Sequence, residues 1–501
     1  MKKYEAPGVY IIEKNAFPEQ VVQVATDVPI FIGYTERAAQ QGADVTGVPV
    51  RVTSLKEFEL CFGKAPAARF DFSLRAGEPV LEQEGASNLI LHSAIRLFFE
   101  NGGCKCWILS VGCYGEGEPA IAKSAEHFSE AVWQQVALQE EPSMVVIPEA
   151  VLLPSPEDYK TVWDRGLAHC AETQKRVAIV DVFNGDRKRT YDEADVISGK
   201  TGLRNMLTAE DLSFAAAYYP WVNTTLHVAS DLTFDNISAD TRKAFFDYVR
   251  QDPSAQGSDA QKAALERTLD LVVDDKTSDA DKAGCEQGLR VLSKRYKDLI
   301  EHAVAALNVM PPSSALAGAY ARTDNHTGVW QAPANIGLSS VVSPCIVISD
   351  AEQEDLNAPL DGKAVNAIRS FPARGTFVWG ARTLAGNSSE WRYVNVRRTA
   401  IMLEQSIEAA LDAFVFSPNT EPTWVTIKHS IEYFLNSYWK AGAFVGATPD
   451  EAYRVDVGLG TTMTAMDVET GTMNIVVQVS LLRPAEFLVL PFRLQVQTKQ
   501  D

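Results

Sequence analysis

Three closely spaced cysteines are the residues of this chain that most suggest metal chemistry. Cys104, Cys106 and Cys113 lie in the segment GGCKCWILSVGCYG. Structural zinc sites usually combine a C-x₂₋₄-C pair with a second pair of Cys or His, whereas the first spacing here is only C-x-C. Residues 106–113 also alternate as a strand does, which would direct Cys104 and Cys106 to one face and Cys113 to the other. We therefore expect small residues in and beside a buried strand, and no metal site.

A second candidate for chemistry is the Gly-Lys-Thr tripeptide at 199–201. A phosphate-binding P-loop needs a glycine five residues before the Gly of this tripeptide, and that position is Ala194. The preceding residues 192–195 read DEAD, and no apolar strand leads into them. The pair Gly115 and Gly117 lacks the third glycine of a dinucleotide-binding motif. We interpret both patterns as fortuitous.

The remaining polar residues form no catalytic constellation. The 7 histidines are spread singly, at positions 92, 127, 169, 227, 302, 326 and 429. They lack the paired spacing of a metalloprotease, and no G-x-S-x-G nucleophile motif occurs. The Asp-rich segment 274–281 lacks the spaced ligands and the loop glycine of an EF-hand. We predict a protein that is not an enzyme, with no catalytic residues, no metal site and no cofactor.

The composition describes a large acidic chain with cores of ordinary size. It has 501 residues, a formal net charge of −19 and 46% hydrophobic residues. At about 100–200 residues per domain we expect two to four domains, and the acidity argues against a general nucleic-acid binder. No apolar run approaches the roughly 20 residues of a membrane span, and the first residues lack the apolar core of a secretory signal. The odd number of scattered cysteines fits reduced thiols made in a cytoplasm.

The hydrophobic pattern predicts a mixed α/β chain. Strands are expected at 21–35, 106–113, 144–148 and 176–183, and helices at 87–102, 124–139 and 156–173. This alternation favours βαβ units. Residues 251–282 contain no aromatic residue and are predicted to be a polar surface insertion, followed by one amphipathic helix at 285–308. In the last third the pattern predicts helices at 398–416 and 423–445 and strands at 473–482 and 486–498.

Both ends of the chain are strand-forming, without an evident hairpin partner of their own. In 486–498, Phe492, Leu494 and Val496 alternate with polar residues, so that one face is apolar. An unpaired strand promotes aggregation unless a designated partner pairs with it, and one such partner is a sheet on a neighbouring copy. The alternative is that the two ends pair with each other inside one domain. The residues alone leave both possibilities open.

Long motifs then carry a family resemblance. YEAPGVYIIEKN and VATDVPIFIGYTE lie at 4–15 and 24–36, and MPPSSALAGAYARTDNHTGVWQAPAN lies at 310–335. The last third contains VWGARTL, EWRYVNVRRTAIMLEQSI, FSPNTEPTW, GATPDEAYRV and RPAEF. These motifs closely resemble those of contractile tail sheath proteins of bacteriophages and of extracellular contractile injection systems. Residues of about 103–300 match no block of that family, and the loop at 456–473 departs from it.

The resemblance implies a mixed α+β and α/β fold. A shared sheath domain would be built from the N- and C-terminal segments with exchanged β-strand arms, and an α/β outer domain would be inserted into it. The expected division is an N-terminal arm at 1–35, a helix-containing segment at 36–102, a variable outer domain at 103–308, a sheath domain at 309–485 and a C-terminal arm at 486–501.

The resemblance also implies a function. Sheath subunits polymerise helically around an inner tube and contract from a metastable extended state, which drives the tube through a target membrane. The implied partners are other copies of the chain, the inner tube protein, and baseplate and cap proteins, without direct nucleic-acid binding or stable membrane insertion. Assembly is expected in a bacterial cytoplasm, and the product would be a phage tail or an injection particle. The alternatives are a sheath paralogue adjoining the baseplate or cap, and a soluble enzyme that uses the βαβ region.

The expected contact residues follow from this resemblance. For the N-terminal arm, at about 12–32, they are Val21, Val22, Val24, Ile30 and Ile32. For the C-terminal arm they are Leu488, Leu490, Phe492, Leu494 and Val496. Candidates for facing the inner tube are Lys428, His429, Lys440, Arg397 and Arg398. For each of these five, an ordinary surface charge or an interior ion pair is the alternative.

Overall fold

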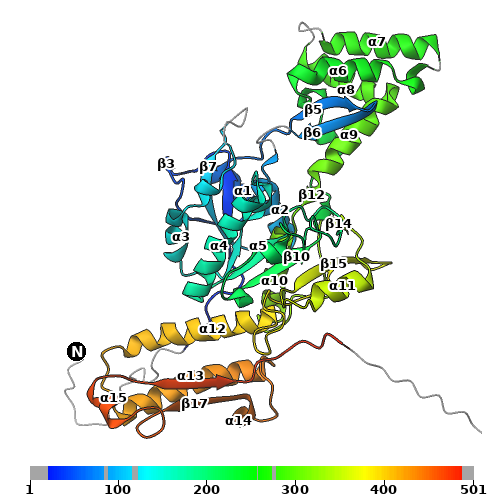
Figure 1. Ribbon diagram of the computed structural model, residues 1–501. Coiled ribbons are helices and arrows are strands. Elements are labelled where there is room, and N and C mark those ends of the chain that lie inside the picture. The colour runs from blue at the N-terminus through cyan, green and yellow to red at the C-terminus, as the bar shows by residue number, and fades with distance from the viewer. Residues whose placement is uncertain (1–20, 84–87, 116–121, 257, 274–277, 488–501) are drawn as a thin grey trace, which may run out of the picture. The chain divides into compact units, whose positions relative to one another are not determined.

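The computed structural model consists of two compact units, which are described one at a time (Figure 1). It describes residues 21–83, 88–115, 122–256, 258–273 and 278–487. The larger unit comprises residues 25–329 and 333–398. The smaller unit comprises residues 399–501 together with 1–24 and 330–332. Within the described ranges, no helix is both long enough and apolar enough to cross a membrane.

The larger unit is built on a nine-stranded sheet with the strand order β13-β16-β15-β10-β9-β8-β1-β7-β4. The strands are β1 (Pro29–Thr35), β4 (Val50–Val52), β7 (Cys106–Cys113), β8 (Met144–Val146), β9 (Val177–Asp181), β10 (Ala215–Tyr219), β13 (Ile336–Gly337), β15 (Val365–Phe371) and β16 (Gly375–Val378). From β7 through β15 neighbouring strands run parallel, whereas β4, β13 and β16 pair antiparallel. The predicted βαβ alternation is confirmed.

The central strands of the sheet consist almost entirely of buried residues. Every residue of β1, β8, β9 and β10 is buried, as in parallel sheets that are covered on both faces. Helices α2 (Leu91–Glu100), α3 (Glu130–Ala137) and α4 (Pro156–Thr173) lie in the connections between strands of the parallel part. The strand predicted at 106–113 and the helix predicted at 156–173 match β7 and α4 residue for residue. The first strand, by contrast, begins only at Pro29.

Helix α10 (Ser313–His326) explains the apolar motif in the middle of the chain. Its residues from Ser313 to Ala321 are all buried. A Cβ atom at Gly318 would collide with the backbone oxygen of Phe98 in α2, so glycine lets the two helices approach closely. Phe98 in turn packs edge-on against Phe31 of β1, with 5.3 Å between ring centroids. The motif therefore specifies a helix crossing in the core.

A second core lies in the same unit, apart from the large sheet. It is formed by β5 (Phe70–Arg75), β6 (Glu78–Gln83), α6 (Ala239–Arg250), α7 (Asp259–Val273), α8 (Asp279–Leu292) and α9 (Lys294–Leu307). Leu265, Leu269 and Val272 of α7 are buried in it, so this helix contributes to a core as well as to the polar surface. The single helix predicted at 285–308 is wrong. The helix is interrupted at Ser293, which separates α8 from α9. The Ser293 hydroxyl donates to Asp252 and also caps α9.

The smaller unit contains helices and a short ladder. Helix α12 (Val394–Leu411) begins in the larger unit and ends in the smaller one, and α13 (Glu421–Lys440), α14 (Pro449–Ala452) and α15 (Ala465–Glu469) follow. Strands β17 (Tyr453–Val457) and β18 (Ile475–Val479) pair antiparallel. The two helices and the strand predicted at 473–482 are confirmed with shifted ends. The strand predicted at 486–498 lies outside the described residues from 488 onward.

A buried carboxylate joins β9 to α10. Asp181, the last residue of β9, is fully buried, and its oxygens accept hydrogen bonds from the backbone N–H (2.8 Å) and the hydroxyl (2.5 Å) of Ser313. Burial raises the pKa of Asp181 to about 7, against the opposing effect of these hydrogen bonds. The folded chain therefore holds a proton on Asp181 at pH values where the unfolded chain has lost it.

This difference predicts a pH dependence of stability. As the pH rises from about 4 to about 7, the free energy of unfolding of the wild type should decrease relative to that of Asp181→Asn, by up to roughly 1.4 kcal/mol per pH unit. Above about pH 7 the difference between the two proteins should stay constant. Urea unfolding at several pH values measures this difference. Asp240→Asn, which removes an exposed carboxylate on α6, is the matched control for the substitution itself. A difference between the wild type and Asp181→Asn that does not change with pH would contradict the prediction.

Candidate assembly surfaces

The β17–β18 ladder is a sheet with two open edges. Its register pairs Tyr453 with Val479, Val455 with Val477 and Val457 with Ile475. In the part of the chain that the structure describes, neither strand has a second partner in its sheet. Within the described residues, each strand therefore has one edge whose backbone N–H and C=O groups have no strand partner, and such an edge can pair with an added strand.

The side chains of the ladder are also incompletely covered. Val455 of β17 is 1% exposed, and β17 packs against α13. In β18, which reads IVVQV, no residue is buried, and Val476 is 42% exposed. A two-stranded ladder is marginally stable by itself, and an exposed apolar edge strand favours pairing with another chain. The ladder is thus a candidate acceptor for a strand among the described residues.

The predicted N-terminal arm residues fall into two groups. Residues 21–24 form an extended segment of the smaller unit in which Val21 is buried and Val22 is 75% exposed. The N–H of Val24 donates to Ser406 of α12 (3.0 Å), and Tyr438 of α13 donates to Gln23 (2.5 Å). This segment is therefore attached to helices of its own chain.

Ile30 and Ile32 belong to the second group, and here the prediction needs correction. Both are fully buried in β1, which is paired to β7 on one side and to β8 on the other. Because both edges of β1 are occupied inside the subunit, these two residues are core residues and not arm residues. The predicted C-terminal arm residues Leu488, Leu490, Phe492, Leu494 and Val496 lie outside the described residues.

Three of the predicted tube-facing residues lie on α13. His429 and Lys440 are exposed, and Lys428 is partly exposed. Lys428 and His429 each approach Glu432, at 3.7 Å and 3.5 Å. The structure thus brings these three side chains onto one helix of the smaller unit.

Arg397 and Arg398 have a different role, which corrects their assignment to a surface. The Arg398 side chain is 3% exposed and makes two bonds to Asp324 of α10, at 3.0 Å and 2.6 Å, and one to the backbone oxygen of Thr26. The Arg397 guanidinium lies 3.6 Å from the ring centroid of Trp391 and 4.1 Å from that of Phe214. Both arginines are interior residues that fasten the start of α12 within the larger unit, which is the alternative left open by the sequence.

Removing one partner of this buried ion pair should be costly. Arg398→Ala leaves the Asp324 carboxyl in the interior without its arginine partner, and we expect a loss of roughly 3–5 kcal/mol in the free energy of unfolding. Lys440→Ala, at an exposed position, should change it by less than about 0.5 kcal/mol. Chemical denaturation of both variants measures the difference. Equal small effects would show that Arg398 is a surface residue after all.

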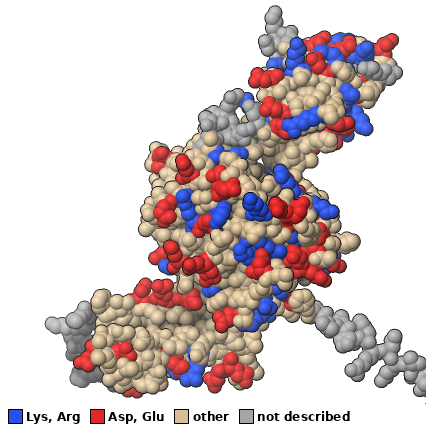
Figure 2. All heavy atoms as spheres, in the orientation of Figure 1, with Lys and Arg blue, Asp and Glu red and all other residues tan. Residues whose placement is uncertain are grey.

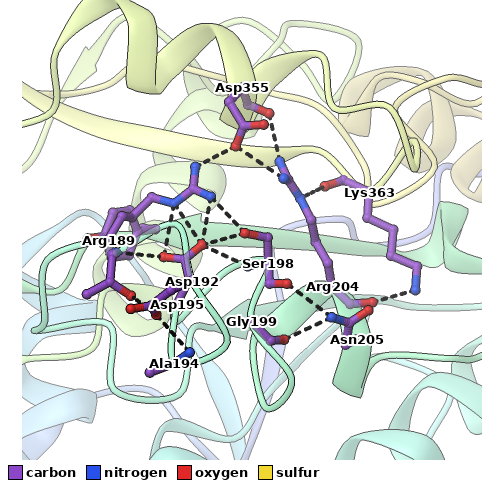
Figure 3. A network of polar contacts seen from close by, with 12 residues as sticks. Arg189, Asp192, Ala194, Asp195, Ser198, Gly199, Arg204, Asn205, Asp355 and Lys363 are labelled. Carbon is purple, nitrogen blue, oxygen red and sulfur yellow. Dashed lines mark hydrogen bonds and ion pairs between the residues drawn. The ribbon is translucent and has the colours of Figure 1, made fainter.

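A second buried network holds the crossover between β9 and β10 (Figure 3). Asp195, whose side chain is 0% exposed, accepts hydrogen bonds from Arg189 (2.8 Å) and from the hydroxyl of Ser198 (2.6 Å). Asp355 accepts from both Arg189 (2.5 Å) and Arg204 (3.2 Å). Burial opposes ionisation, but the hydrogen bonds from Arg189 and Ser198 hold the pKa of Asp195 well below its usual range. The crossover contains the short helix α5 (Leu203–Met206) and the 3₁₀ turn Leu212–Phe214 but no long helix, and these polar contacts stabilise it instead.

The Gly-Lys-Thr tripeptide lies inside this crossover. The N–H of Gly199 donates to the backbone oxygen of Asp195, and the oxygen of Gly199 accepts from the Asn205 side chain. The tripeptide therefore forms a turn of the network shown in Figure 3. Cys106 is buried while Cys104 and Cys113 are exposed, and the described residues contain no group of three or more His, Cys, Asp or Glu arranged to hold a metal ion.

The charges on the face shown in Figure 2 are mixed. Acidic and basic side chains of the larger unit are interspersed there, and no basic stripe crosses the described part of this face. Nucleic-acid binding proteins usually present such a stripe, so this face does not favour that class of partner.

Comparison with known proteins gives the fold. The sheath of the PVC extracellular contractile injection system in its contracted state is 24% identical, with 99% of each chain covered and a TM-score of 0.61. The contracted helical sheath of the anti-feeding prophage is also 24% identical, with 98% of this chain and 99% of that chain covered and a TM-score of 0.61. This chain has the contractile sheath fold. The resemblance carried by the sequence motifs is thereby confirmed at the level of fold.

The similarity to sheath-fold chains is not confined to one part of the chain. A chain from the contracted baseplate structure of the anti-feeding prophage is 23% identical, with 99% of this chain and 100% of that chain covered and a TM-score of 0.64. No protein-family model matches this sheath-fold chain, and no curated protein matches it.

Sequence reasoning missed several residues that shape this fold. It did not single out β17, although YRVDV at 453–457 alternates with a two-residue period that is typical of a half-buried strand. It also missed the buried acids Glu149, Asp181 and Asp195. No local pattern distinguishes them among the 65 acidic residues of the chain, because their burial depends on the tertiary fold.

Proposed function

We propose that this chain is a structural subunit of a contractile sheath, not an enzyme. It would polymerise helically around an inner tube and contract from an extended state to drive the tube through a target membrane. The observation that carries the proposal is the β17–β18 ladder, which has open edges and an apolar strand without a buried residue. The sheath fold over nearly the whole chain supports it.

The ladder fits a role as acceptor for the arms of neighbouring subunits. The N-terminal arm would comprise residues before Val21, because residues 21–24 are held by α12 and α13 of their own chain. The C-terminal arm would comprise 486–501. Strand addition forms several backbone hydrogen bonds at once, so such a junction can persist while other contacts between subunits change. The segment of about 103–308 is proposed to be the variable part of the chain; its strands β7 to β10 share the large sheet with β1 and β15, so it is not a separate domain.

Contraction needs no nucleotide hydrolysis if it increases the area buried between subunits. A gain of about 300 Å² of apolar area per subunit would give roughly 7 kcal/mol at about 25 cal/mol/Å², before entropy and strain are subtracted. Summed over many subunits, this gain can do mechanical work, and the extended state must then be trapped kinetically.

The partners follow from the same proposal. They are other copies of the chain, an inner tube protein, and baseplate and cap proteins of the same particle. Lys428, His429 and Lys440 on α13 are proposed to face the tube, where exposed charges give contacts that can be released. A subunit adjoining the baseplate is the second candidate, because one chain with the same fold comes from a baseplate structure. Assembly in a bacterial cytoplasm remains part of the proposal.

Electron microscopy of the full-length protein tests the proposed function. Expressed alone and purified at low salt, it should form hollow cylinders, since strand addition links each copy to its neighbours. Deleting residues 486–501 should leave soluble subunits that no longer polymerise. Intact protein that stays monomeric even with its tube protein present would contradict a main sheath subunit.

A point substitution tests whether the ladder is covered in the assembly. Val476→Glu places a charge at a position that is 42% exposed in the subunit, so the subunit should stay folded. If a neighbour covers this position, the buried charge should raise the critical concentration for polymerisation at least roughly tenfold. Val291→Glu, on α8 at an 85% exposed position, is the matched control and should polymerise normally. Normal polymerisation of both variants, measured by sedimentation, would contradict strand addition at the ladder.

A further inference from the structure

The large sheet contains a topological switch point at β1. The chain leads from β1 to β7 on one side and then returns to β8 on the other side of β1, before it continues to β9 and β10. In open parallel sheets, ligands bind beyond the carboxyl ends of the strands at such a point. Anionic groups are held there by the N-terminus of the helix that follows the first strand. In this chain, the longest helix between β1 and β7 is α2.

A side chain of the protein itself occupies this position. Glu149 follows β8 in the 3₁₀ turn Pro148–Leu152 and is 0% exposed. One carboxylate oxygen accepts the N–H of Tyr34 at 2.7 Å, at the carboxyl end of β1. The other accepts the N–H groups of Ile90 (2.8 Å) and Leu91 (3.0 Å), at the start of α2. The carboxylate therefore binds three backbone donors from two elements.

The local backbone is shaped around this carboxylate. A Cβ atom at Gly33 would lie 2.6 Å from Oε2 of Glu149 and 3.3 Å from the Leu91 side chain, so only glycine allows the approach. The register of β1 against β7 shifts between Gly33 and Tyr34, which is where the Tyr34 N–H turns to the carboxylate. Gly33 belongs to the FIGYT run of the N-terminal motif, and the close contact with Glu149 explains why glycine stands at this position.

We propose that Glu149 is an internal anion ligand: its carboxylate fills the switch-point site that a bound anion would otherwise take, and so fastens β1 to α2. The proposal does not depend on the assembly role of the chain. Asp181 repeats the arrangement one strand further along, since it is the last residue of β9 and binds the first turn of α10. Burial raises the pKa of Glu149 to about 7, while its three N–H donors and nearby Lys123 favour the charged form.

Replacement of the carboxylate by a small anion tests the proposal. In full-length Glu149→Ala at neutral pH, three buried N–H groups lose their acceptor, and the midpoint of thermal unfolding should fall by roughly 5 °C. Sodium formate should recover at least half of this loss, whereas sodium chloride at equal ionic strength should not. Wild type should show no formate effect beyond that of chloride. An unchanged midpoint in the variant, or the same formate effect in both proteins, would overturn the proposal.

Two further variants extend the test, and the first of them keeps it decisive if Glu149→Ala folds poorly. Glu149→Gln keeps the volume of the side chain and should lose stability without rescue by formate, because no space is left for the anion. Gly33→Ala should lower the midpoint strongly in the wild type and much less in the Glu149→Ala background, because the oxygen that it would strike is gone. Rescue of Glu149→Gln by formate, or equal losses from Gly33→Ala in both backgrounds, would show that the site is not filled by Glu149.

Discussion

A backbone N–H or C=O group that leaves water must find a partner, and this requirement organises the whole chain. The larger unit meets it from within. Parallel strands buried on both faces satisfy one another, and buried acids take the donors that the sheet leaves over at the ends of strands and the starts of helices. Glu149 and Asp181 accept hydrogen bonds from backbone N–H groups in this way, and Asp195 does the same for the N–H of Ser198 in the crossover. Where the crossover after β9 lacks a long helix, a network of arginines and aspartates supplies the missing partners.

In the smaller unit, the described residues leave strand edges in contact with water, where another chain could pair with them. Its β17–β18 ladder ends at open edges, and the apolar side chains of β18 are only partly covered by their own chain. One part of the subunit is thus complete in itself, and the other is suited to completion by another copy. This division of roles gives the proposed sheath subunit a stable body together with a junction that forms only in the assembly.

The sequence predicted the regular parts of this fold well and the irregular parts poorly. Strand β7 and helix α4 have strong periodicity and clear ends, so their bounds were found to the residue. The helix expected at 285–308 breaks at Ser293, because a buried contact with Asp252 decides the break and no local pattern shows it. For the candidate sites, Arg397, Arg398, Ile30 and Ile32 were assigned to surfaces although they are interior. The charge or hydrophobicity of a residue does not show which partner its side chain contacts. Only the fold places Asp324 beside Arg398, and β7 and β8 on the two sides of Ile30 and Ile32.

The most direct measurement of the central claim is hydrogen exchange at the backbone of β18. The account predicts that amides of Ile475–Val479 exchange at least about tenfold more slowly in assembled protein than in soluble subunits that lack 486–501, because an added strand would occupy the open edges. The fully buried strand β9 lies inside the subunit and should exchange alike in both samples. Equal exchange of β18 in the assembled and soluble forms would contradict the claim that a neighbouring chain completes the ladder.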